Sequence, residues 1–234
     1  DLSGKDSRYE AYGDFVIKYS SDGISYIDGT ETVWDESFEM KSPIVDICDD
    51  YIAVADKNTN DIFIYNKDGK VGHASTSYPI VKLEVASQGV VAALLEDKNA
   101  NYIEVYDKDG EKLISHKTLL RENGYPLNFS ISEKGSKMVV SYVTVNGGVM
   151  KNKVLFYNFS SAGQNASDMM VGEFDQYGEI LVPMVKFISD NVAIAVGENV
   201  LTVYSMRDKP SVKCEKKFKD EIQKVFYSDN YVGF

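Results

Sequence analysis

Residues 79–110, PIVKLEVASQGVVAALLEDKNANYIEVYDKDG, contain one unit of a pattern that runs through most of the chain. The unit has a first strand that starts at proline, a second strand that is almost wholly apolar, a polar loop, and a third strand that ends in tyrosine. An Asp-Gly pair then leads into a more polar fourth stretch. Because an Asp-Gly pair between apolar strands is a strong hairpin signal, we expect four strands joined by tight turns.

Three further segments repeat this order with different side chains. The first strands of the four units start at Pro43, Pro79, Pro126 and Pro183, and the third strands end at Tyr65, Tyr106, Tyr157 and Tyr204. The apolar second strands span residues 51–55, 90–95, 138–142 and 192–196. Two of the turns after the tyrosine are nearly identical, NKDG at 66–69 and DKDG at 107–110. Such a period indicates a repeat architecture.

The second strand of each unit distinguishes between all-β architectures. A strand with one face in water alternates apolar and polar residues, whereas these strands are apolar on both faces. Neighbouring blades of a β-propeller bury a strand in this way, and polar fourth strands such as residues 111–117 suit an outer edge. The sequence therefore predicts an all-β, propeller-like fold of four-stranded antiparallel blades. An ordinary β-sandwich with chance similarity between its strands is the alternative.

We expect a single propeller domain over residues 1–234 with about five blades and the start of a sixth. The blades span approximately residues 11–41, 42–77, 78–124, 125–179 and 180–221, and the first is the weakest match. Residues 222–226 and 230–234 look like the first two strands of the sixth. A closed ring ends on a complete blade, so the propeller looks truncated. We expect the natural chain to continue, or a second copy to cover the exposed blade edges.

Composition restricts the class of partner. The formal net charge is −11, and 44% of the residues are hydrophobic. Nucleic acid and anionic lipid both require clustered Lys and Arg, so we expect neither as a partner. Cys48 and Cys214 fall in different predicted sheets, which argues against a disulfide between them. No apolar run approaches the roughly 18 residues of a membrane span. The chain opens at Asp1 rather than Met, which is consistent with removal of an upstream segment.

The run from Tyr12 to Phe234 resembles an uncharacterised domain-of-unknown-function family of low-GC Gram-positive bacteria. The matching pieces are Tyr26 with Asp28-Gly29 and Trp34, Ala55-Asp56, residues 132–135 with 140–142, and residues 156–159. The resemblance implies a propeller of the broad quinoprotein-like kind, on the extracytoplasmic face of the cell membrane. It also implies a single N-terminal membrane anchor that is absent from this chain. The family has no established activity, so no reaction is implied.

Two motifs of other propellers are echoed weakly. Quinone-binding propellers repeat an Ala-x-Asp-x-x-x-Gly-x-x-x-Trp pattern, of which only Ala55-Asp56 and Trp34 occur here, in different units. We interpret Trp34 as a packing residue at a blade edge and expect no cofactor. Residues 20–26, SSDGISY, resemble the Asp-box of sialidase-type propellers with one residue missing. We interpret this segment as a hairpin turn.

Two loops carry alternating Asp and Asn, at Asp56, Asn58 and Asn60 and at Asp97, Asn99 and Asn101. Oxygens with this spacing can surround a calcium ion, but the Gly and Glu that an EF-type loop needs are missing. Asp and Asn also cap turns through their own backbone. We expect no metal-binding residues, and keep calcium in these two loops as the alternative.

No residues for catalysis can be assigned. His73 and His116 lie on or near polar fourth strands, with no second His or Cys close by, so neither supports a nucleophile–histidine arrangement. Three glycosylation sequons, at Asn128, Asn158 and Asn165, are interpreted as chance matches. The favoured function is therefore a non-catalytic binding or scaffolding propeller for a protein or glycan ligand. The alternative is a glycan-active hydrolase or lyase whose carboxylates come from distant loops and leave no sequence trace.

Overall fold

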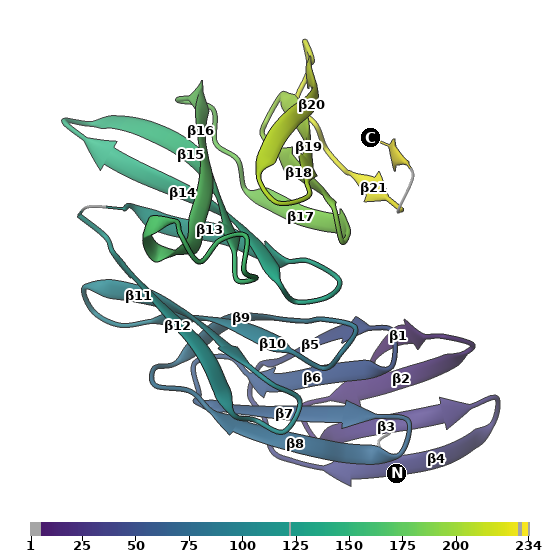
Figure 1. Cartoon of the computed structure of the whole chain (residues 1–234). Coiled ribbons are helices and arrows are strands. Elements are labelled where there is room, and N and C mark those ends of the chain that lie inside the picture. The colour runs from purple at the N-terminus through teal and green to yellow at the C-terminus, as the bar shows by residue number, and fades with distance from the viewer. Residues whose placement is uncertain (1–5, 122, 229–230, 234) are drawn as a thin grey trace. The chain divides into compact units, whose positions relative to one another are not determined.

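Short antiparallel strands build almost the whole described chain in this computed structural model, which describes residues 6–121, 123–228 and 231–233. Their order follows the sequence within every sheet (Figure 1). The first sheet contains β1 (Arg8–Tyr12), β2 (Phe15–Ser20), β3 (Gly23–Asp28) and β4 (Glu31–Ser37). The second contains β5 (Pro43–Cys48), β6 (Tyr51–Asp56), β7 (Asp61–Asn66) and β8 (Gly69–Ser75). The third contains β9 (Ile80–Val85), β10 (Val91–Glu96), β11 (Ala100–Tyr106) and β12 (Lys112–Leu119).

Two further four-stranded sheets and one strand pair follow. The fourth sheet contains β13 (Tyr125–Ile131), β14 (Lys137–Asn146), β15 (Val149–Asn158) and β16 (Met170–Gly178). The fifth contains β17 (Met184–Ser189), β18 (Val192–Val196), β19 (Val200–Met206) and β20 (Pro210–Lys217). The pair is β21 (Phe226–Tyr227) with β22 (Val232–Gly233), and the short helical turn η1 (Ser167–Met169) precedes β16. In the described ranges, no helix is long and apolar enough to cross a membrane.

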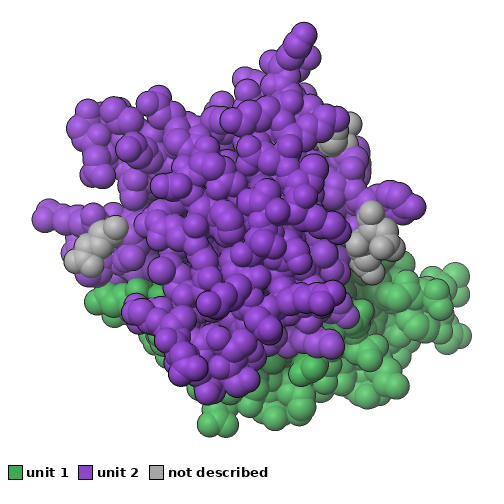
Figure 2. All heavy atoms as spheres, turned by 45° about the horizontal axis from the view of Figure 1, so that its top comes forward, with its two compact units in different colours: residues 1–98, 102–117 green, residues 99–101, 118–234 purple. Residues whose placement is uncertain are grey.

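Strand contacts divide the chain into two compact units, coloured separately in Figure 2. Unit 1 comprises residues 1–98 and 102–117, and unit 2 comprises residues 99–101 and 118–234. Unit 1 therefore contains the first two sheets and most of the third. Unit 2 contains the fourth and fifth sheets and the C-terminal strand pair.

The first sheet begins earlier than the sequence pattern suggests. We expected its blade to start at about residue 11, but β1 starts at Arg8 and pairs with β2 along its whole length. The side chains of Arg8–Ala11 are exposed, so this strand has no hydrophobic run by which sequence could detect it.

The repeat assignment is confirmed by the position of its tyrosines. Tyr65, Tyr106, Tyr157 and Tyr204 end or nearly end the third strands of four different sheets, and all are buried. The second strands are buried on both faces as expected: the exposed fraction is 0–2% for Val54, Ala92, Leu94, Val140 and Ala195. Fourth strands are the exposed ones, since seven of the eight residues of β20 are exposed. The two cysteines lie in different sheets, on β5 and β20.

Successive sheets pack face to face inside each unit. In unit 1, Ile52 and Val54 of β6 pack with the first sheet, while Ala53 and Ala55 pack with the third. Neighbouring side chains on a strand point to opposite faces, so one strand supplies two cores. In unit 2, Ala193 and Ala195 of β18 belong to the core shared with the fourth sheet. This layering explains why the second strands are apolar at nearly every position.

Candidate binding surface

The fifth sheet has a second apolar face, opposite the one that packs on the fourth sheet. Ala193 and Ala195 point to the fourth sheet, so Ile194 and Val196 point the other way. Their register partners on β19, Val203 and Leu201, extend this second face. Within the described residues, the sheet that follows the fifth along the chain is the two-stranded β21–β22 pair.

The C-terminal segment, residues 218–228 and 231–233, covers part of this face. Phe218, Ile222, Val225 and Val232 pack against Ile194, Val196 and Leu201. Two backbone hydrogen bonds hold the segment: Phe218 N–H donates to the carbonyl of Asn199 (2.8 Å), and Ile222 N–H donates to that of Glu198 (2.7 Å). We expected residues 222–226 to form a strand, but only Phe226 does so. Ile222 and Val225 instead lie on the sheet as a cover, which the apolar pattern alone could not distinguish from a strand.

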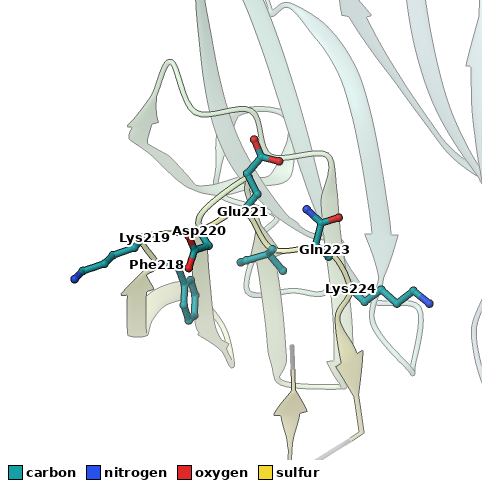
Figure 3. Close-up of a pocket in the computed structure, with 7 residues that line it drawn as sticks. Phe218, Lys219, Asp220, Glu221, Gln223 and Lys224 are labelled. Atoms are coloured by element: carbon teal, nitrogen blue, oxygen red, sulfur yellow. The ribbon is translucent and has the colours of Figure 1, made fainter.

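Two hollows remain beside this cover. A groove of about 650 Å³ runs along the sheet face. Its lining residues are Ile188, Ser189, Val192, Leu201, Val203, Lys213 and Val232. The turn of the segment, residues 218–224, encloses a second hollow of about 510 Å³ (Figure 3). Figure 3 shows Lys219 and Lys224 extending outward on opposite sides of this turn. The charged residues here are of both signs, so the hollow has no strong single-sign field.

Aromatic side chains on or beside the β21–β22 pair, which contributes Val232 to the groove, are exposed. The exposed fraction is 68% for Phe226 and 79% for Tyr231. They lie on or beside the β21–β22 pair, in which Phe226 faces Gly233 and Tyr227 faces Val232. We expected the second of these strands to cover residues 230–234. The strand is Val232–Gly233, and residues 230 and 234 lie outside the described part of the chain. We call the groove and these aromatic residues the C-terminal surface.

In the loops considered for calcium, Asp56, Asn60 and Asp97 form hydrogen bonds with backbone groups. The Asp56 carboxylate accepts the backbone N–H groups of Lys41 (3.0 Å) and Ser42 (2.6 Å). The Asn60 amide donates to the carbonyl of Thr76 (3.0 Å), and Asp97 accepts the N–H of Lys98 (2.7 Å). Among residues 6–121, 123–228 and 231–233, no three acidic, His or Cys side chains are grouped as metal ligands would be. These contacts are those of turn-capping residues.

The other motif residues also have structural roles. The Trp34 indole stacks on Tyr65 (ring centroids 5.4 Å apart) and donates to the carbonyl of Lys67 (3.1 Å), so it packs between the first two sheets. Residues 20–26 contain the hairpin turn between β2 and β3, as expected, with Ser21 and Asp22 between the two strands. His73 is on β8, stacks on Phe63 and lies 2.8 Å from the Asp61 carboxylate. His116 is on β12, the fourth strand of its sheet.

Sequence reasoning missed a buried carboxylate, Glu104 of β11, which is 1% exposed. Its oxygens accept hydrogen bonds from the Lys112 ammonium (2.7 Å), the Ser77 hydroxyl (2.8 Å) and the Tyr106 hydroxyl (2.5 Å). Burial opposes ionisation, but these donors outweigh it and the pKa of Glu104 is lowered. The donors come from three separate segments, so no local sequence signal marks this cluster.

A second buried charge lies in unit 2. The Lys137 ammonium is 2.7 Å from the Asn191 side-chain oxygen and 3.3 Å from the Asp190 carboxylate. Burial favours the neutral form of Asp190. The backbone N–H of Lys134 and the charge of Lys137 outweigh that effect, and the pKa of Asp190 is lowered. Both carboxylates are thus held ionised, whereas a general acid at neutral pH needs a raised pKa.

Solved structures similar to this chain are β-propellers. Hsv2 of Kluyveromyces lactis superposes with a TM-score of 0.63 at 13% identity, over 93% of this chain and 74% of that one. The WD40 domain of Toxoplasma gondii coronin gives 0.61 at 9% identity, over 92% and 58%. Chaetomium thermophilum Sqt1, bound to the N-terminus of ribosomal protein L10, gives 0.60 at 10% identity, over 93% and 63%. The sheets described above are thus those of a β-propeller, with five blades and part of a sixth.

The chain belongs to the family of unknown function DUF5711, whose model matches residues 1–234. No curated protein matches the sequence. The expected membership of an uncharacterised propeller family is therefore confirmed.

Proposed function

We propose that this chain is a non-catalytic binding or scaffolding propeller that takes a protein partner on its C-terminal surface. The observation that carries the proposal is the exposure of Phe226 and Tyr231 on or beside the β21–β22 pair, whose Val232 lines the groove. Large solvent-exposed apolar patches mark interaction sites, and aromatic residues are enriched at protein–protein interfaces.

The partner that fits this surface presents an apolar β-strand. The β21–β22 pair has no third strand within the described residues, so an extended segment can add to its edge through backbone hydrogen bonds. Alternate side chains of such a strand would point towards the groove lined by Val192, Leu201 and Val203. The similar propeller Sqt1 is bound to the N-terminus of a ribosomal protein, which supports peptide recognition by analogy of fold.

The charged groups favour binding over glycan cleavage. A glycosidase needs one carboxylic acid with a raised pKa beside a second carboxylate. Two carboxyl groups with a shifted pKa, Glu104 and Asp190, are both shifted downward, with lysine and backbone amide groups among their donors. Each carboxylate is also occupied by structural contacts.

We further infer that the domain acts on the extracytoplasmic face of a low-GC Gram-positive cell, held by one N-terminal anchor that precedes this chain. The family resemblance supports this location. Protease added to intact cells should degrade the full-length protein if it faces outward. Degradation only after lysis would contradict the location without affecting the proposed binding surface.

Photo-crosslinking in native cells tests the partner surface. A photoreactive amino acid at position 231 of the full-length protein should give a discrete crosslinked product with one protein. The same label at Val145, a 67% exposed position on β14, is the matched control and should not give this product. Phe226→Ser should abolish the product at position 231.

Identical products from both positions, or none from position 231, would contradict the proposal. A product containing a second copy of the chain would identify that copy as the partner.

A further inference from the structure

A small aromatic cavity of about 120 Å³ lies in unit 1, between the first two sheets. Three ring side chains, Tyr12, Phe15 and Tyr26, form part of its lining. The remaining lining residues are Gly13, Asp49, Asp50 and Lys67. The proposed partner surface belongs to unit 2, so this cavity is a separate feature of the molecule.

Tight turns bring these residues together. Tyr12 ends β1 and Phe15 starts β2, on either side of one hairpin turn. Asp49 and Asp50 form the turn between β5 and β6. The Tyr12 hydroxyl donates to the carbonyl of Asp50 (2.6 Å), which fixes one turn against the other. Asp49 adopts a left-handed conformation (φ 47°), which is uncommon for a residue with a side chain and holds the turn in one shape.

The three rings form a cluster with two near-perpendicular contacts. The ring of Tyr12 is 5.5 Å from that of Tyr26 at 84°, and the ring of Phe15 is 5.2 Å from it at 72°. Tyr12 and Tyr26 are each 5% exposed, so they are held by the surrounding core. A rigid aromatic lining loses little conformational freedom when a ligand enters.

Negative charge surrounds this ring cluster. The pKa of Tyr12 is raised to about 12, first by burial and then by the charge of Asp50, with a smaller contribution from Asp68. Burial and the charge of Asp28 raise the pKa of Tyr26. Lys67 contributes the one positive charge of the lining, against the two carboxylates of Asp49 and Asp50. The site therefore favours a cation over a neutral or anionic ligand.

We propose that this cavity binds the alkylammonium group of a small molecule, with a quaternary ammonium preferred. Aromatic rings attract such cations through their quadrupoles, and carboxylates at the rim add attraction without a specific hydrogen bond. The cavity is small, at about 120 Å³, which favours a compact cation such as a nitrogen with its methyl groups.

Calorimetric titration of the whole chain tests this proposal with two probes of nearly equal shape. Choline should bind, whereas its neutral isostere, with a tert-butyl group in place of trimethylammonium, should bind roughly 5- to 30-fold more weakly. Glycine betaine carries a carboxylate that the acidic rim repels, so it should also bind more weakly than choline. Equal binding of choline and the neutral isostere would mean that the cavity is only an apolar gap, and would overturn the proposal.

Four variants then locate the site. Phe15→Leu keeps an apolar side chain but removes a ring, so choline affinity should fall several-fold. Asp50→Asn should lower affinity and its dependence on salt. Lys67→Gln removes the competing charge and should raise affinity. Asp35→Asn is the matched control, because Asp35 is an exposed carboxylate on β4 that does not line the cavity.

Each variant is compared by circular dichroism before titration, so that a folding defect is recognised. Lys67→Gln gives the clearest result for two reasons. The Lys67 side chain is exposed, so its replacement should cost little stability. A misfolded protein would also not bind choline more tightly. The site would be refuted if choline affinity were unchanged in Phe15→Leu, Asp50→Asn and Lys67→Gln. It would also be refuted if neither choline nor tetramethylammonium bound detectably at millimolar concentration.

Discussion

The second and fifth sheets have nearly the same second strand but different surroundings. Residues 51–56 read YIAVAD and residues 192–197 read VAIAVG, and both are apolar on both faces. In the second sheet, a neighbouring sheet packs on each face of β6. In the fifth, one face of β18 packs on the fourth sheet, and the other packs on the C-terminal segment beside a groove. An identical pattern therefore does not imply an identical degree of cover.

A matched pair of core truncations should show this difference most strongly. Leu94 of β10 is 2% exposed, and Leu201 of β19 is 7% exposed and lines the groove. Leu94→Ala should lower the free energy of unfolding by roughly 2–5 kcal/mol, because it leaves a cavity around a nearly fully buried position. Leu201→Ala should cost about half as much, since water already reaches its surroundings. Chemical denaturation measures both. A larger loss for Leu201→Ala would show that the groove face is as tightly packed as the covered ones.

The buried Glu104 cluster gives the next largest effect. Glu104→Gln should cost about 2 kcal/mol at pH 7, since it replaces charge-assisted hydrogen bonds from Lys112, Ser77 and Tyr106. The folded-state pKa of Glu104 is lowered, so its stabilising contribution is complete above the unfolded pKa, near 4.3. That contribution is lost as pH falls from there through the folded value.

Urea denaturation between neutral pH and about pH 3 tests this dependence. The wild-type chain should lose more stability over this range than Glu104→Gln. Glu173→Gln on β16 is the control, because Glu173 forms a longer, exposed ion pair of 3.4 Å with Lys153. Parallel pH curves for wild type and Glu104→Gln would mean that Glu104 does not titrate differently in the folded state.

Two turn glycines can be compared in the same way, because Gly110 packs against a neighbouring sheet and Gly147 does not. Gly110 has φ 94°, and a side chain there would collide with the carbonyl of His73 on the second sheet. Gly147 has φ 59°, with open space around it. Gly110→Ala should cost about 2 kcal/mol, from strain plus collision, and Gly147→Ala about 1 kcal/mol from strain alone. Equal melting temperatures for the two variants would show that the turn at Gly110 can move away from the second sheet.

The smallest effect on stability is expected on the C-terminal surface itself. Tyr231→Ser should change the free energy of unfolding by less than about 0.5 kcal/mol, because Tyr231 is 79% exposed. The same change should reduce self-association in sedimentation at high concentration if a second copy is the partner. A stability loss comparable with that of Leu94→Ala would show that Tyr231 belongs to the core.

The sequence predicted most of the fold because the repeat consists of residues that are buried at the same strand positions in each sheet. Third-strand tyrosines and doubly apolar second strands are required wherever sheets stack, so Tyr65, Tyr106 and Val54 could be assigned without coordinates. β1 was missed because Arg8–Ala11 are exposed and carry no such pattern. The expected strand at residues 222–226 was wrong, since Ile222 and Val225 are apolar as a strand would be but cover a sheet instead.

By itself, the sequence determined the class of fold, the strand order and the residues between sheets, because these depend on local periodicity and turn chemistry. Only the tertiary structure decided which apolar faces stay open and which charges meet. Tyr12, Tyr26 and Asp50 surround one cavity, and Glu104 meets Ser77 and Lys112, through turns and strands well separated along the chain. Such contacts depend on how strands are placed in space, and no local pattern encodes that placement.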